Sequence, residues 1–217
     1  MAGHDALTRT ARPERPRLYR PAWRDGVQPD RTHPGRPGRS AHPLTRKGFA
    51  QAEAIGEALR ERLGESPALT LWSSPTGRAL QTLAVIAEHL ALDWHETRHD
   101  GRLIELGFGS WGGQDFAALS SIHGSIVHPH GMAVGAPDGE RYAAMAARLS
   151  AWLADTAEHD GDRLILMHGL SSRVLRGLML GLPDDPHCGV PVAERLPQGS
   201  IVMIESAAET VIHRACP

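Results

Sequence analysis

The sequence is poor in three features that define whole classes of protein. Only two cysteines occur in 217 residues, Cys188 and Cys216. Their spacing matches neither a CxxC pair nor a zinc site, so we interpret them as reduced, structural thiols. No run approaches the roughly 20 apolar residues that cross a bilayer. The first twenty residues lack the apolar core of a secretory signal. These absences argue against disulfide-rich, membrane and secreted proteins, and we expect a cytoplasmic one.

Positive charge is concentrated at the N-terminus. Residues 1–47 carry eleven Lys or Arg and four Asp or Glu, a net charge of +7, and the remainder carries −9. Basic arms can bind nucleic acid, but these arginines alternate with prolines and no aromatic ladder accompanies them. We therefore predict a disordered arm over residues 1–16, a single domain over residues 17–217, and no nucleic-acid partner.

Short apolar runs alternate with helical patterns after residue 44. In the first helical pattern, Thr45 is a candidate N-cap and Gly64 a candidate C-terminal glycine. The alternation predicts an α/β fold, a three-layer α/β/α sandwich around a mostly parallel sheet. We predict strands over 68–72, 163–167 and 200–205, and helices over 45–64, within 73–92, over 139–161 and over 171–180.

The segment before residue 44 fits this pattern less well. Residues 17–23 ("RLYRPAW") are a poor strand because Pro21 lies in the middle. Proline cannot donate to a sheet ladder, so a central position for this strand would be unusual.

Polar residues follow two of the predicted strands. Arg78 comes shortly after the strand at 68–72, and His168 directly follows the strand at 163–167. Ligands in open α/β sheets bind at the carboxyl ends of the strands. Glu105 lies between these segments in a stretch rich in glycine and aromatic residues. A guanidinium, an imidazole and a helix N-terminus together would suit an anion.

Six phrases of the chain, in order, resemble segments of the histidine phosphatase superfamily, in the branch with phosphoglycerate mutases and small-molecule phosphatases. The resemblance covers about residues 17–205. The phrases are "PLTRKGFAQAEAIGEAL", "LWSSPTGRALQT", "LIELGFGSWGG", "APDGERYAAMAARLSAWL", "LILMHGLSSRVLRGLMLGLP" and "LPQGSIVMI".

The resemblance implies a role for each polar residue. Arg78 would clamp a phosphate, Glu105 would donate a proton to the leaving group, and His168 would stabilise the transferring phosphoryl group. Gly169 would let the backbone approach the phosphate closely. The implied activity is hydrolysis of a small phosphate monoester by phosphohistidine chemistry, with no metal and no cofactor. The implied ligand is that monoester or inorganic phosphate.

The nucleophile is where the chain departs from the family. The family pattern is Arg-His-Gly after the first strand, and the matching position here reads Arg24-Asp25-Gly26. Arg24 would bind phosphate, whereas Asp25 would bring a further negative charge to a dianion. His33 and His42 lie nearby, but neither follows a strand exit of this kind.

Two explanations of this departure stay open. In the first explanation, the chain has lost its nucleophile and become a binder of a phosphorylated ligand or of a protein partner. Alternatively, the reading frame of the N-terminal segment is disturbed.

Two further expectations concern the middle of the chain. The 23 residues between Gly113 and Pro137 contain no Lys or Arg to hold a substrate carboxylate, which favours hydrolysis over mutase activity. The same region holds His123, His128 and His130. Carboxylate or thiolate ligands are not evident beside them, so we favour a flexible lid over a metal site.

Overall fold

The computed structural model describes residues 17–22, 43–159 and 161–215. The predicted arm at 1–16 lies outside the described residues, and so do Arg24, Asp25, His33 and His42. The division into an arm and a single domain therefore stays a prediction.

The described residues form a six-stranded sheet with the strand order β3-β2-β4-β1-β5-β6. Neighbours from β3 to β1 run parallel, whereas β5 is antiparallel to both β1 and β6. The sheet is thus mostly parallel, as predicted. The strands are Arg17–Ala22 (β1), Leu69–Ser73 (β2), Arg98–His99 (β3), Asp162–His168 (β4), Ile201–Glu205 (β5) and Ala208–His213 (β6).

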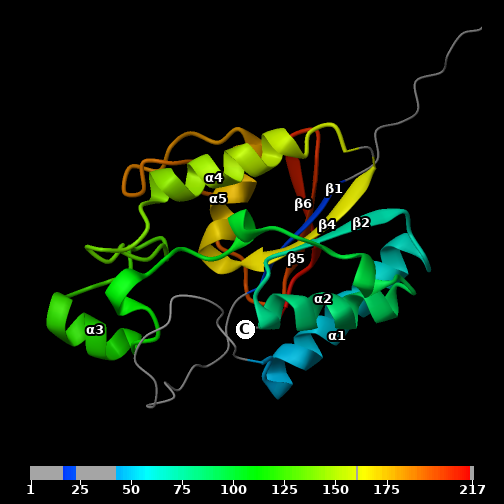
Figure 1. The fold of residues 1–217 in the computed structure, drawn as a ribbon, viewed down its shortest axis with the longest axis horizontal. Coiled ribbons are helices and arrows are strands. Elements are labelled where there is room, and N and C mark those ends of the chain that lie inside the picture. The colour runs from blue at the N-terminus through cyan, green and yellow to red at the C-terminus, as the bar shows by residue number, and fades with distance from the viewer. Residues whose placement is uncertain (1–16, 23–42, 160, 216–217) are drawn as a thin grey trace, which may run out of the picture.

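Helices cover both faces of this sheet. Figure 1 shows α1 and α2 together on one side and α4 and α5 on the other, which gives the predicted three layers. The α-helices are Arg46–Leu63 (α1), Gly77–His89 (α2), Phe116–His123 (α3), Tyr142–Asp155 (α4) and Gly169–Leu180 (α5). Short 3-10 helices span Trp94–Glu96, Gly101–Leu103 and Gly109–Trp111.

The alternation of side chains along β4 divides the core in two. Leu164 and Leu166 pack with apolar residues of α1 and α2, and Ile165 and Met167 pack with those of α4 and α5. Successive residues of a strand point to opposite faces, so a strand buried on both sides reads as a continuous apolar run. This is why "LILM" signals a central strand.

The first helix begins and ends where its sequence indicates. The Thr45 hydroxyl accepts a hydrogen bond from the Gly48 amide at 3.1 Å, and Gly64 takes a φ of 79° after the last turn. A side-chain cap satisfies an N–H that has no partner inside the helix, and glycine tolerates the positive φ. The fourth helix is shorter than predicted: α4 begins at Tyr142 and ends at Asp155.

The expectation against a central first strand was wrong. The backbone of β1 lies between β4 and β5, and Pro21 is paired in register with Met167 of β4. The pairing of β1 with β5 involves only Arg17 to Tyr19. Pro21 therefore lies beyond the part of β1 that is bonded on both sides, where a missing N–H matters less.

Among the described helices, none combines the length and the apolar character that a membrane crossing requires.

Candidate functional site

The carboxyl ends of β2 and β4 lie side by side and bring two of the predicted residues together. Parallel pairing places Ser73 opposite Leu166, and the Ser74 amide donates to the Leu166 carbonyl at 2.8 Å. His168 ends β4, and Arg78 lies in the first turn of α2. Arg78 Nη2 reaches His168 Nδ1 at 3.2 Å.

The contacts of His168 define the protonation of its ring. A guanidinium only donates hydrogen bonds, so Nδ1 must accept the one from Arg78. The proton of the neutral ring then lies on Nε2, which is 2.8 Å from Ser74 Oγ and 3.3 Å from Thr76 Oγ1. The imidazole is therefore an acceptor toward Arg78 and a donor toward the hydroxyl groups.

Burial keeps this imidazole neutral. His168 is 0% exposed. Its desolvation, with the positive charges of Arg78 and Arg148 nearby, lowers the pKa of His168 to about 3. The ring in this arrangement acts as a neutral hydrogen-bonding group and not as a cation.

Glu105 lies at the beginning of the helix that follows His168. Its Oε1 accepts from the Ser171 amide at 2.9 Å and its Oε2 from the Leu170 amide at 3.0 Å. Oε1 also accepts from the amide of Leu106 at 2.9 Å. The first N–H groups of a helix have no partner inside it, and a carboxylate there also meets the positive end of the helix dipole. Glu105 thus caps α5 from a distant segment.

Two residues that the sequence analysis did not single out hold the Glu105 segment in place. Arg148 of α4 makes a two-pronged ion pair with Glu140, at 2.7 and 3.0 Å, and also donates to the Glu105 carbonyl at 3.2 Å. Glu140 accepts from the Gly107 amide at 3.1 Å, and its own amide donates to the Gly107 carbonyl at 2.7 Å. Arg148 and Glu140 thus form hydrogen bonds with the backbone on both sides of Leu106, at Glu105 and Gly107.

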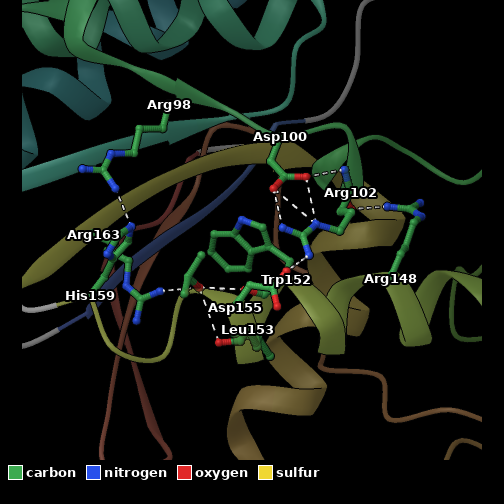
Figure 2. A network of polar contacts seen from close by, with 10 residues as sticks. Arg98, Asp100, Arg102, Arg148, Trp152, Leu153, Asp155, His159 and Arg163 are labelled. Carbon is green, nitrogen blue, oxygen red and sulfur yellow. Dashed lines mark hydrogen bonds and ion pairs between the residues drawn. The ribbon is translucent and has the colours of Figure 1, made fainter.

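A second polar network joins α4 to the segment before Glu105 (Figure 2). Asp100 accepts from the Arg102 guanidinium at 2.8 Å, and Arg102 Nη1 contacts Asp155 Oδ2 at 2.5 Å. These contacts lower the pKa of Asp100 and raise that of Arg102. Figure 2 also shows Arg148 donating to the Arg102 carbonyl, which connects this network to the pair described above.

The structure therefore brings Arg78, Glu105 and His168 to one edge of the sheet, with Gly169 as the first residue of α5. Sequence reasoning missed Ser74, Thr76, Glu140 and Arg148. The first two lie within the "SSPTGR" phrase and Glu140 within "APDGE", but nothing local to Arg148 indicates its partner eight residues earlier.

One family of known proteins matches most of this chain. A sequence model of the histidine phosphatase superfamily (branch 1) matches residues 24–210. The chain belongs to the histidine phosphatase superfamily. Its relatives include the probable phosphoglycerate mutase GpmB of Salmonella arizonae, which is 33% identical over 151 residues, or 67% of each chain.

Solved structures of this superfamily share the fold. The mycobacterial glucosyl-3-phosphoglycerate phosphatase has a TM-score of 0.63, with 21% identity over 88% of both chains. YhfR of Bacillus stearothermophilus has a TM-score of 0.58, with 24% identity over 78% of this chain and 82% of its own. The predicted phosphoglycerate mutase-like architecture is confirmed.

Proposed function

We propose that this chain is a phosphatase-like protein that acts on a small phosphate monoester by metal-independent phosphohistidine-type chemistry, with turnover limited by Asp25. The observation that carries the proposal is the contact between Arg78 and His168 beside the start of α5, at the carboxyl ends of two parallel strands.

The charges of this site suit a phosphate monoester. Arg78 supplies a planar set of N–H donors that matches phosphate oxygens. Helices α2 and α5 both begin here, at Gly77 and Gly169, so the positive ends of two helix dipoles lie near the same point. A phosphate dianion that enters the site would accept the hydrogen bond that Arg78 now donates to His168. Neutral His168 would keep its ability to donate from Nε2.

Glu105 would supply the proton for the leaving oxygen. A carboxyl group that gives a proton must first hold one, and both Glu105 oxygens now accept backbone N–H bonds. Protonation of Glu105 would therefore weaken the cap of α5. We propose that capping and proton donation compete at this residue, with Arg148 and Glu140 keeping it in position.

The register of β1 supports Asp25 as the residue at the nucleophile position. Ala22, the last residue of β1, is paired with His168. Asp25 follows Ala22 by three residues, so the chain can carry it at most about 11 Å farther. The family match begins at Arg24, the residue just before it. A carboxylate at this point repels a phosphate dianion, whereas a neutral imidazole does not.

Asp25 also supports a second candidate function. A member that holds phosphate through Arg24, Arg78 and His168 but cannot form phosphohistidine would serve as a binder of a phosphorylated ligand or of a protein partner. For the catalytic form we favour hydrolysis over mutase activity, because residues 114–136 contain no Lys or Arg.

Titration calorimetry with inorganic phosphate and vanadate tests the site. We expect Arg78→Ala to weaken binding about 10- to 100-fold, since a hydrogen bond to a charged group contributes about 1.5–3 kcal/mol. The matched control is Arg62→Ala, which removes an exposed arginine from the last turn of α1. Equal affinities of the wild type and Arg78→Ala would refute the site.

The substitution Asp25→His tests the nucleophile. Loss of a nucleophile alone costs on the order of 10³–10⁶ in rate, so we expect little hydrolysis of p-nitrophenyl phosphate by the wild type and a clear gain in the variant. A phosphohistidine should be trapped on the new imidazole by rapid quench and mass spectrometry, and adding His168→Ala should abolish the gain. A folded Asp25→His protein that binds phosphate without turnover or phosphohistidine would refute the assignment.

A further inference from the structure

Two closed turns beside α5 bring together donor groups that are far apart in the sequence. In the first turn, the Gly131 amide donates to the His128 carbonyl at 2.8 Å, and Val127 forms a bridge with Ala133. In the second turn, Asp184 forms a bridge with Pro191. Backbone bonds thus hold each turn before any ligand binds.

Three side chains from these turns bring possible metal-ligand atoms close together. His130 Nε2 lies 3.5 Å from Asp185 Oδ2 and 3.9 Å from Cys188 Sγ, and the three donor atoms all lie within 4.8 Å of one another. The separation of 3.5 Å is longer than an ordinary N–H···O hydrogen bond of 2.7–3.2 Å. The Cys188 thiol is also within hydrogen-bonding reach of both His130 and Asp185, so the three side chains form one polar cluster.

These separations match donors that share one metal ion. Zn–S and Zn–N bonds of about 2.3 and 2.0–2.1 Å at a tetrahedral angle place sulfur and nitrogen about 3.6 Å apart. The same geometry places a histidine nitrogen and a carboxylate oxygen about 3.4 Å apart. The observed 3.9 and 3.5 Å need only small movements of half-buried side chains.

Neighbouring groups orient two of the three donors. Asp185 Oδ1 accepts from the amides of His187 and Cys188 at 2.9 and 3.0 Å, which leaves Oδ2 on the side of His130. Arg173 of α5 donates to the His130 carbonyl at 3.1 Å and to the Ala193 carbonyl at 2.8 Å. Such supporting contacts are typical of metal sites, where they fix the direction of each ligand.

Two more imidazoles border the cluster. The rings of His128 and His187 stack at a centroid distance of 5.0 Å, and their distances to the His130 ring are 5.6 and 5.4 Å. His187 is exposed and His128 half-buried, so both rings have room to turn. Either imidazole could occupy a fourth coordination position.

We propose that His130, Asp185 and Cys188 bind one zinc ion, with His128 or His187 nearest to the fourth position. Imidazole and thiolate are ligands that zinc prefers, and hard cations such as Mg²⁺ prefer all-oxygen sites. The Cys188 thiolate and the Asp185 carboxylate would together carry two negative charges. These charges would balance the two positive charges of a zinc ion bound beside the Arg173 guanidinium. The ion would tie the segment before α4 to the segment after α5.

Binding of Zn²⁺ and Co²⁺ to the full chain tests the site after a chelator has removed metal. We expect one zinc per chain after dialysis, measured by mass spectrometry, and a thiolate-to-cobalt charge-transfer band in the near ultraviolet. Cys188→Ser should abolish the band, and both Cys188→Ser and His130→Ala should weaken zinc binding at least about tenfold in competition with a chromophoric chelator. The matched controls are Cys216→Ser and His95→Ala.

A readout on the wild type keeps the test independent of the variants. Zinc should slow alkylation of the Cys188 thiol by iodoacetamide, with Cys216 as the internal reference in peptide mass spectrometry. Unchanged zinc affinity in Cys188→Ser and His130→Ala, no retained zinc, or equal alkylation of Cys188 with and without zinc would each overturn the proposal.

Discussion

Replacing Glu105 by glutamine tests how the Glu105 segment is attached to α5. Both carboxylate oxygens accept backbone N–H groups, two on Oε1 and one on Oε2. A glutamine side chain has only one oxygen. With that oxygen at the Oε1 position, its NH₂ group faces the Leu170 amide, and Leu170 is only 7% exposed. The opposite orientation leaves two N–H donors without an acceptor.

The expected loss of stability follows from these contacts. A buried donor left without a partner costs about 1–3 kcal/mol. Removing the negative charge from the helix N-terminus costs about 0.3–1 kcal/mol more. We therefore expect Glu105→Gln to lower the free energy of unfolding by about 1.3–4 kcal/mol. For a chain of this size that corresponds to a fall in Tm of about 3–16 °C.

Thermal and urea unfolding, followed by circular dichroism, measure this effect without reference to activity. The matched control is Glu57→Gln, which removes an exposed carboxylate from the surface of α1. A Glu105→Gln protein that unfolds within about 1 °C of the wild type would refute the capping argument. A large fall in Tm with unchanged phosphate affinity would place Glu105 in support of the helix and outside the phosphate contacts.

Two further predictions concern α5 and the residue before it. The folded-state pKa of His168, about 3, lies below its usual 6.5, so only the unfolded state gains a proton in this interval. The contribution of His168 to stability is complete above pH 6.5, and it falls toward pH 3 by at most about 1.4 kcal/mol per pH unit. The variant His168→Asn should therefore show a weaker dependence of stability on pH. Identical pH slopes for the wild type and the variant in urea titrations would contradict this prediction. Gly177→Ala should destabilise the protein by about 1–3 kcal/mol, because a Cβ there would lie 2.5 Å from the Pro191 carbonyl oxygen. Gly77→Ala, which enters open space, is the control in the same melts, and equal Tm values would refute the close approach.

Local patterns in the sequence were sufficient for the elements that position the site. Thr45 and Gly64 mark the ends of α1 because capping involves only residues within one turn. The largely apolar runs before Ser74 and His168 predict β2 and β4, since a strand buried on both faces reads as a nearly continuous apolar run. Parallel strands expose their carboxyl ends at one edge, so the approach of Arg78 to His168 was also within reach of the sequence.

Tertiary structure alone decided the remaining contacts. The central place of β1 depends on pairing with β4 and β5, and this pairing overrides the poor local propensity around Pro21.

The cap that Glu105 provides for α5 joins residues more than sixty positions apart. His130 and Cys188 come within 3.9 Å across a separation of 58 residues. Periodicity describes only which face of its own element a side chain occupies, whereas these contacts depend on how distant turns pack against one helix. That packing supplies the carboxylate and the thiol that the histidine-rich segment lacks in its own sequence.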